Sequence, residues 1–314
     1  MGVARAGGLV NELTTAGRLG RVRATAYSKL TLSLRVGALR DDGFHEVEAL
    51  AVSISDPHDV IEVKAVPHPG GVTLEMRGET DEVPTGMSNL AARAADELLV
   101  RAGRSGHGVK LTVRKKIPAG AGLGGGSADA AATLVAIRRM LEIDLDDATL
   151  LELGAKLGSD VSFCLAGGAA WMRGRGERIE AVDLPAGMPF LVALPPFRLS
   201  TPVVYRAWDD LGRPRAARSV PATGAVAAAA LLPELSNDLE PAAEHVEPRL
   251  AQFRIDLEAA AEAPALLAGS GSAYVVPVPD GRDVDAYARR VSGRMRVPVT
   301  PAASVSRGVR LGSG

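Results

Sequence analysis

Five of the seven residues 120–126 are glycine, and this run lies between a strand-like stretch, residues 109–117, and an alanine-rich helical stretch, residues 127–142. Packing does not explain the run, because glycine has no side chain and is costly to order. A glycine loop before a helix offers bare backbone N–H groups and the positive end of the helix dipole, which together hold phosphate groups. The pattern therefore predicts a phosphate-binding loop, with Ser127 as the helix N-cap and Asp129 in the first turn.

Two common phosphate loops differ from this one. A P-loop closes with a Lys-Ser or Lys-Thr pair, whereas this loop closes with Gly126-Ser127, so the P-loop is excluded. The dinucleotide-binding pattern G-x-G-x-x-G is matched by Gly120, Gly122 and Gly125. In that unit a second parallel strand follows the helix, but here residues 141–148 lead directly into another helical pattern. A dinucleotide-dependent oxidoreductase stays an alternative, and the missing strand counts against it.

The glycine-rich loop and three further segments resemble, in the right order, the motifs of the GHMP kinases. The three segments are residues 26–45, 157–163 and 268–273, and the resemblance covers about residues 22–311. Two short signatures, residues 200–205 and 237–240, look most like the members that phosphorylate 4-(cytidine 5'-diphospho)-2-C-methyl-D-erythritol (CDP-methylerythritol) in the non-mevalonate isoprenoid pathway. The alternatives are another GHMP small-molecule kinase of the homoserine kinase type, or a weakly active nucleotide-binding homologue.

The resemblance implies an α+β, two-domain GHMP kinase fold with the active site between the domains. The N-terminal domain would be like domain 2 of ribosomal protein S5, and the C-terminal domain would be ferredoxin-like. We expect residues 1–20 to form a disordered extension, residues 21–187 the N-terminal ATP-binding domain and residues 188–314 the C-terminal domain.

ATP is the phosphoryl donor that the resemblance implies, with Mg²⁺ accompanying it. No histidine spacing suggests a metal site, so no residue is predicted as a metal ligand. The residues expected to bind ATP are Pro118, Ala119, Gly120, Ala121, Gly122, Leu123, Gly124, Gly125, Gly126, Ser127 and Ala128.

Two residues, Lys29 and Asp160, are the candidate catalytic groups. Phosphoryl transfer needs positioning, charge stabilisation and one group that accepts the alcohol proton. The resemblance assigns the proton to Asp160 and places Lys29 against it and the phosphoryl group, where its charge offsets the charge that builds there. The alternatives are that Asp160 caps a short helix after Gly158, and that Lys29 is a solvated residue of an edge strand.

Five residues are the candidates for binding the alcohol substrate. The resemblance implies that Phe44 and Tyr205 stack on the cytosine and that His45 forms a hydrogen bond with it; alternatively, His45 is an exposed hairpin residue. Thr31 stands where the family has an asparagine that positions the substrate hydroxyl. Thr201 contacts the diphosphate or ribose, or caps the helix that begins there.

The composition argues against two classes of partner, nucleic acids and membranes. The net charge of −1 gives no field for nucleic acid or an anionic membrane, and no apolar stretch reaches the roughly 18 residues of a membrane span. A single cysteine, Cys164, excludes an internal disulfide framework and fits the reducing cytoplasm. We therefore expect a cytoplasmic enzyme with a small-molecule substrate.

The elements that must position these residues follow from hydrophobic periodicity and turn residues. Residues 212–230 are low in complexity and are expected to form a mobile loop. The expected strands are residues 22–26, 31–36, 46–55, 60–66, 169–173, 189–194 and 297–305, and the expected helices are residues 89–102, 148–157, 250–261, 284–291 and one beginning at Thr201-Pro202. Hairpin turns are expected at residues 174–177 and 269–272.

Overall fold

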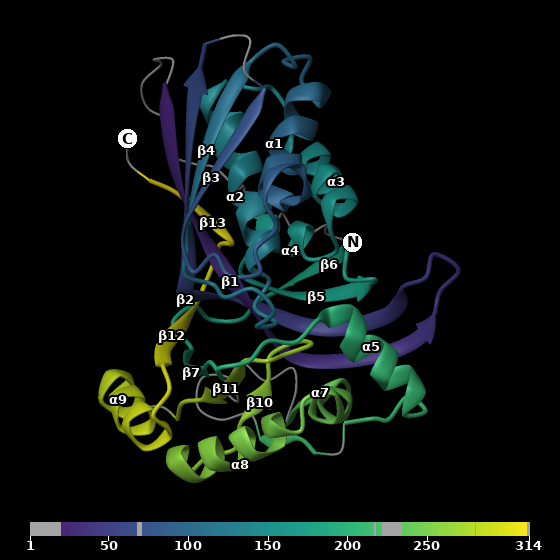
Figure 1. The fold of residues 1–314 in the computed structure, drawn as a ribbon, viewed down its shortest axis with the longest axis vertical. Helices are drawn as coiled ribbons and strands as arrows, with labels where there is room; N and C mark the ends of the chain where they lie inside the picture. Colours follow the sequence, from purple (N-terminus) through teal and green to yellow (C-terminus); the bar gives the residue numbers. More distant parts are fainter. Residues whose placement is uncertain (1–19, 68–70, 217, 222–233, 280, 313–314) are drawn as a thin grey trace.

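Two long antiparallel strands, β1 (Arg21–Leu39) and β2 (His45–Val66), run through the whole molecule (Figure 1). The computed structural model describes residues 20–67, 71–216, 218–221, 234–279 and 281–312. Four short strands were expected where these two lie. The pairing continues because register shifts, first between Tyr27 and Ser28 and again after Thr31, bend the strands without ending them.

The strands of the described residues form one mixed sheet of 13 strands. Its main path runs β10-β11-β7-β12-β2-β1-β9-β8, while β4 and β5 also pair with β2, and β13 pairs with β1. The remaining strands are β3 (Val72–Gly78), β4 (Gly108–Lys115), β5 (Ala169–Gly174), β6 (Arg178–Val182), β7 (Pro189–Ala193), β8 (Val220–Pro221), β9 (Glu234–Asn237), β10 (Leu266–Leu267), β11 (Tyr274–Pro277), β12 (Val299–Val305) and β13 (Val309–Leu311).

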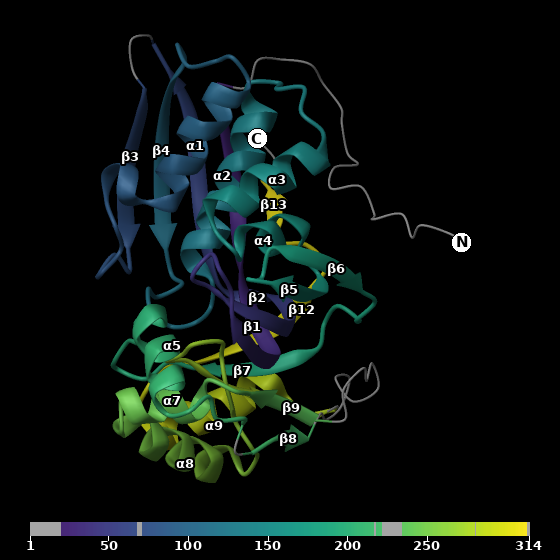
Figure 2. The same ribbon diagram turned by 90° about the vertical axis from the view of Figure 1, so that its right-hand side faces the viewer.

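The helices form two groups, one in the upper part of the molecule and one in its lower part (Figures 1 and 2). The first group is α1 (Leu90–Arg101), α2 (Gly125–Met140), α3 (Asp147–Leu157) and α4 (Val161–Ala166), preceded by the short 3-10 helix Gly86–Ser88. The second group is α5 (Thr201–Asp210), α7 (Glu240–Val246), α8 (Arg249–Ala261) and α9 (Val284–Met295). No strand separates α2 from α3, so the dinucleotide-binding alternative lacks its second strand and is wrong.

Helix α2 lies against β1 and β2 and is buried along most of its length. Its alanines suit this place, because they favour a helix and their small side chains allow a close approach to the sheet. The helix begins at Gly125, and its N-cap is Gly124 in the left-handed conformation with φ 69°. The prediction of Ser127 as the N-cap is therefore wrong: Gly124, three residues earlier, adopts positive φ without strain and ends the loop there.

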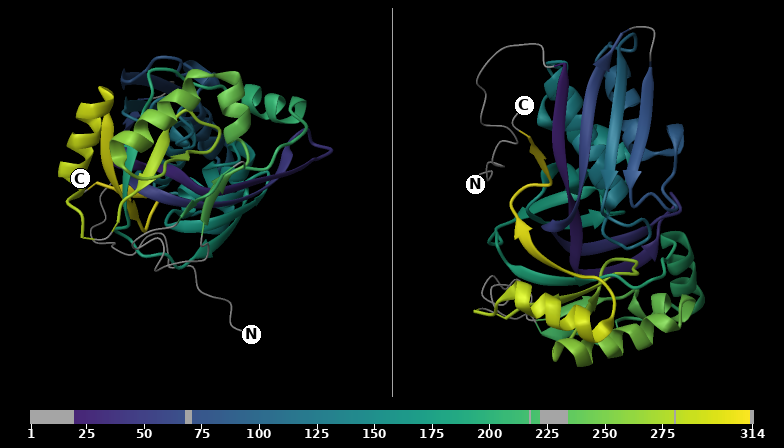
Figure 3. Two further views of the ribbon diagram at one scale, coloured as in Figure 1. Left: turned by 90° about the horizontal axis from the view of Figure 1, so that it is seen from below. Right: turned by 60° about the vertical axis from the view of Figure 1, so that its left-hand side comes forward.

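The C-terminal residues return to the first strands. Strand β12 pairs with both β7 and β2, and β13 pairs with β1 (Figure 3). The sheet is therefore continuous across the expected boundary at residues 187 and 188, and the division into two domains stays a prediction. The expected extension, residues 1–20, lies outside the described residues except for Gly20.

Several elements lacked a clear sequence signal. Strands β3, β8, β9 and β13 and helix α7 are short or irregular in pattern, and none was expected. Most of the expected mobile loop lies outside the described residues. Its described part is held by ion pairs, because Arg215 contacts Asp238, and Arg218 contacts Glu240 and Glu258.

A buried charge cluster joins β2, β4 and α2 beneath the glycine-rich loop. The Lys115 ammonium donates to the Asp129 carboxylate at 2.7 Å and also to the Asp59 carboxylate, and each of the three side chains is at most 3% exposed. Burial would lower the pKa of Lys115, but the two carboxylates outweigh it and raise that pKa. Burial raises the pKa of Asp129 well above its ordinary value. The sequence predicted that Asp129 interacts with the helix dipole in the first turn, but its side chain pairs with Lys115 in this cluster instead.

We predict that Lys115→Met lowers the free energy of unfolding by about 3–5 kcal/mol, because it leaves two buried carboxylates without a counter-charge. The control is Lys116→Met, since that neighbouring side chain is exposed, and its effect should stay within about 0.5 kcal/mol. Urea denaturation followed by circular dichroism measures both. A loss below about 1 kcal/mol for Lys115→Met would show that the cluster does not stabilise the fold.

Candidate active site

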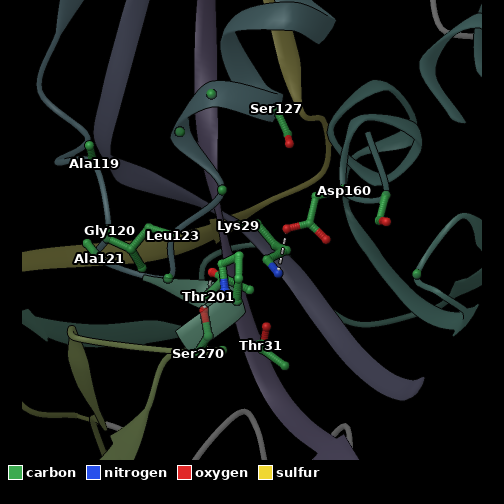
Figure 4. A pocket seen from close by; sticks show the side chains of 18 of the residues that line it. Lys29, Thr31, Ala119, Gly120, Ala121, Leu123, Ser127, Asp160, Thr201 and Ser270 are labelled. Carbon is green, nitrogen blue, oxygen red and sulfur yellow. Dashed lines mark hydrogen bonds and ion pairs between the residues drawn. The ribbon is translucent and has the colours of Figure 1, made fainter. Parts of the chain in front are cut away.

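A cavity of about 810 Å³ lies where the two groups of helices meet the long strands (Figure 4). This volume suits a small-molecule ligand. Much of the lining comes from β1, the start of β2, the glycine-rich loop, the N-terminal ends of α2 and α4, α5 from Thr201 to Asp209, and the turn after β10. All eleven residues expected to bind ATP lie in the loop or at the start of α2, and all except the buried Ala128 line the cavity.

The carbonyl groups of the glycine-rich loop are bound to the rest of the protein. Gly120 O accepts two backbone hydrogen bonds, at 3.0 and 3.2 Å, and Ala121 O and Leu123 O accept one each, at 3.0 and 2.9 Å. The donors are the backbone N–H groups of Lys29, Leu199, Ser272 and Ala273. In the described part of the chain no acceptor faces the N–H groups of residues 122–124. The loop therefore uses its carbonyl groups for contacts within the protein and leaves these N–H groups unpaired, as the predicted phosphate-binding role requires.

Side chains are unfavourable at two glycines of the loop, for different reasons. A Cβ on Gly122 would lie 2.0 Å from the carbonyl oxygen of Ala268, so this position is a close approach between two backbones. Gly124 has φ 69°, and its Cβ would point between Lys29 and Asp160, 3.4 Å from the Lys29 Cβ. Gly124 thus keeps open the space in front of the Lys29–Asp160 pair.

Lys29 and Asp160 form an ion pair with 3.0 Å between Nζ and Oδ2 (Figure 4). Strand β1 supplies Lys29, whose side chain is only 10% exposed, so the alternative of a solvated edge residue is wrong. Asp160 occupies the N-cap position of α4 but accepts no capping hydrogen bond. Its carboxylate turns to Lys29 instead, and at 31% exposure it stays accessible from the cavity. The structure brings these two candidates together; their catalytic roles stay predictions.

Four hydroxyl groups line the cavity around this pair. Thr31 lies two residues after Lys29 on β1, so its side chain shares the same face of the strand and also lines the cavity. Thr201 was expected as a possible helix cap, but Ser200 is the N-cap residue. The Thr201 hydroxyl instead lies 2.7 Å from that of Ser270, which bridges α5 to the turn after β10. Ser127 faces the same space from the first turn of α2 (Figure 4).

The aromatic candidates form the other end of the cavity. The His45 ring stacks on Tyr205, with 5.4 Å between ring centroids and 27° between planes. His45 is 7% exposed, so the alternative of an exposed hairpin residue is wrong. Phe44 is 48% exposed, and the Arg175 guanidinium lies 5.2 Å from its ring centroid. All three aromatic residues line one cavity with the phosphate loop.

The signature over residues 237–240 holds the turn after β10 in place. The Asn237 amide donates to the carbonyls of Leu267 and Gly269, at 2.9 and 2.6 Å. The Asp238 carboxylate accepts from the backbone N–H of Val36 on β1 at 3.0 Å. Asn237 thus positions the turn at residues 268–273, and neither Asn237 nor Asp238 lines the cavity.

Sequence reasoning missed Arg175, Asp209 and the buried Asp59. Asp209 had a signal, because it follows Thr201 and Tyr205 at intervals of four residues and so shares their helix face. Asp59 and Lys115 are 56 residues apart in sequence, and no local pattern predicted their contact.

The described ranges lack two kinds of feature, a metal-ligand cluster and a membrane-spanning helix. They contain no group of three or more His, Cys, Asp or Glu side chains arranged to hold a metal ion. Nor do they contain a helix long and apolar enough to span a membrane.

Comparison with known proteins supports one family. Residues 89–168 match the family GHMP kinases N terminal domain. The chain is 40% identical over 279 residues to the 4-diphosphocytidyl-2-C-methyl-D-erythritol kinase of Pelotomaculum thermopropionicum, covering 88% of this chain and 94% of that protein. It is 38% identical over 281 residues to the enzyme of the same name from Streptomyces coelicolor, covering 86% and 92%.

Solved structures agree with these relatives. A crystal structure of 4-(cytidine 5'-diphospho)-2C-methyl-D-erythritol kinase superposes with a TM-score of 0.71 at 34% identity, covering 93% of this chain and all of that one. Homoserine kinase from Cytophaga hutchinsonii reaches a TM-score of 0.69 at 16% identity, with 96% and 100% covered. The second likeness shows the fold alone, and together the two confirm the expected GHMP kinase fold.

We predict that Gly124→Val weakens ATP binding about tenfold or more, because a β-branched residue is strained at positive φ and its side chain would enter the cavity. Isothermal titration calorimetry with ATP measures the loss. The matched control is Gly187→Val, which has a similar φ of 88° but lies away from the cavity with nothing within 4 Å. Equal loss of affinity in both variants would trace the effect to general destabilisation and contradict the prediction.

Proposed function

Because the chain belongs to the 4-diphosphocytidyl-2-C-methyl-D-erythritol kinase family of GHMP kinases, we propose that it transfers the γ-phosphoryl group of ATP to the 2-hydroxyl of CDP-methylerythritol. It is an ATP-dependent small-molecule kinase, and the reaction belongs to the non-mevalonate route to isoprenoid precursors. The observation that carries the proposal is the Lys29–Asp160 pair, which lines one cavity together with the glycine-rich loop and the aromatic candidates.

The chemistry needs a proton acceptor and a positive charge at the point of transfer. As the substrate oxygen forms its bond to the γ-phosphorus, the bond from that phosphorus to the bridging oxygen of ADP breaks, and the hydroxyl proton passes to Asp160. Lys29 holds the carboxylate at 3.0 Å and offsets charge on the transferred group. The free N–H groups of the loop hold the remaining phosphates, with the dipole of α2 behind them.

The residues around the loop also fit a Mg²⁺ ion that arrives with ATP. Mg²⁺ keeps several waters and takes one or two protein oxygens in addition to phosphates, so it needs no three-residue cluster. The Ser127 hydroxyl lines the cavity at the loop and would hold it. When bound, the ion neutralises charge on the phosphates.

The opposite end of the cavity fits the cytidine portion of the substrate. Tyr205 and Phe44 offer flat ring faces on which a base stacks, and His45 offers a ring nitrogen. Thr201 lies between this end and the loop, where the diphosphate or ribose would pass, and Thr31 faces the reacting hydroxyl. We place the reaction in the cytoplasm, in keeping with the buried free thiol of Cys164.

The proposed substrate is tested by coupled ADP release with CDP-methylerythritol, homoserine and mevalonate as acceptors. We expect turnover with CDP-methylerythritol alone, because only that substrate reaches both the aromatic end and the Lys29–Asp160 pair. Turnover on homoserine would favour the homoserine kinase alternative. Binding of ATP with no turnover on any acceptor would favour a weakly active homologue.

We predict that Asp160→Asn lowers turnover by about two to four orders of magnitude while ATP affinity is retained, because the amide cannot accept the proton and the loop holds the nucleotide. The rate of ADP release and calorimetry with ATP measure the two effects. Asp146→Ala is the control, since Asp146 is a true N-cap that accepts from Thr149 N at 2.8 Å. That variant should lose about 1 kcal/mol of stability and keep its rate. Normal turnover in folded Asp160→Asn would exclude the proposed role.

A further inference from the structure

One face of α5 carries three residues at intervals of four: Thr201, Tyr205 and Asp209. This spacing places them one above another along the helix, and all three line the cavity. Thr201 and Tyr205 have proposed contacts with the substrate. Asp209 lies at the far end of this stripe, and the proposed function does not use it.

Asp209 contacts His45. Its two carboxylate oxygens lie 3.2 and 3.1 Å from Nε2 of the imidazole. The same ring stacks on Tyr205 and meets the edge of Trp208, with 5.4 Å between centroids in each case. The ring is therefore held on one face, at one edge and at one nitrogen, so that its orientation in the cavity is determined.

A second contact keeps the Asp209 carboxylate in the charged form. Arg213, four residues further along the chain, donates to its Oδ1 at 2.8 Å. Partial burial would raise the pKa of Asp209, but the hydrogen bonds from Arg213 and His45 outweigh it and the pKa is lowered. An ionised carboxylate has no proton to donate, so Nε2 of His45 must be the donor in their hydrogen bond.

This hydrogen bond decides the chemistry of the other ring nitrogen. In a neutral imidazole one nitrogen carries the proton and the other is an acceptor, and the partner of the first sets the tautomer. In the neutral ring, a proton on Nε2 leaves Nδ1 of His45 as a bare acceptor. In the described residues Nδ1 has no hydrogen-bond partner, and it is not among the polar atoms sealed from solvent.

We infer that Asp209 is a specificity-determining residue, which fixes the Nε2–H tautomer of His45 so that Nδ1 selects a base with an exocyclic amino group. The inference rests on the proposed function, in which this end of the cavity binds the base. Cytosine presents a donor at its 4-position, whereas uracil presents an acceptor there. A bare Nδ1 accepts from the first and repels the second.

Competition by CDP and UDP against CDP-methylerythritol tests the selection, because the two probes differ only in the base. Wild-type protein should prefer CDP to UDP by about tenfold or more. In Asp209→Asn the amide can turn its NH₂ group toward Nε2, which allows the proton to move to Nδ1, and the preference should fall at least severalfold while KM for ATP is unchanged. The matched control Asp210→Asn alters the exposed neighbouring carboxylate and should keep the wild-type preference.

The tautomer itself is measured by ¹⁵N NMR of protein labelled at the histidine rings. The His45 signals are identified by their loss in His45→Gln. The wild type should show a protonated Nε2 and a bare Nδ1, and Asp209→Asn should change this pattern. The wild-type spectrum decides the question even if the Asp209 variant does not fold.

The outcomes separate this inference from the proposed function. A protonated Nδ1 in wild type, or an unchanged preference for CDP in folded Asp209→Asn, overturns the inference while turnover on CDP-methylerythritol stands. Equal competition by CDP and UDP in an active wild type also overturns it. Failure of CDP to bind a wild type that phosphorylates another alcohol overturns the proposed function, and the base selection with it.

Discussion

The site depends on how the carbonyl groups of the glycine-rich loop are bound. Four backbone donors from β1, from the segment before α5 and from the turn after β10 occupy the carbonyls of Gly120, Ala121 and Leu123. A loop of five glycines in seven residues has many accessible conformations, and these contacts select one of them. These carbonyl groups are bound within the protein, whereas the N–H groups of residues 122–124 make no hydrogen bond in the described residues, which is the arrangement that a phosphate-binding loop needs.

The same contacts link the loop to the catalytic candidates. The backbone N–H of Lys29 donates to the Leu123 carbonyl of the loop, and the side chain of Lys29 pairs with Asp160. One residue therefore positions both the loop and the aspartate. Below the loop, the buried cluster of Lys115, Asp59 and Asp129 ties β4 and α2 to β2. The distance between the glycine-rich loop and the Lys29–Asp160 pair is therefore set by backbone hydrogen bonds and buried charges, which hold positions more closely than flexible surface side chains do.

The two ends of the cavity differ in how they recognise a ligand. At the loop, backbone N–H groups and a helix dipole bind negative charge with little regard to what carries it. At the aromatic end, we propose that ring faces accept any base and that selection falls to a single ring nitrogen of His45, whose proton Asp209 sets. A kinase that uses one nucleotide as donor and another as part of its acceptor needs this difference, because otherwise the two would compete for one site.

The sequence by itself determined much of this protein. Motif residues predicted the phosphate loop, the Lys29 and Asp160 candidates, the aromatic residues and the GHMP kinase fold, because types and local spacing carry those signals. Predictions from local sequence were wrong where long-range contacts determine the structure. Gly124 is the N-cap instead of Ser127, and the four expected strands form two long ones. Only the tertiary structure brought Asp59 to Lys115 and Asp209 to His45, across 56 and 164 residues. Burial and partner charge set the roles of these groups, and both arise only when distant segments fold together.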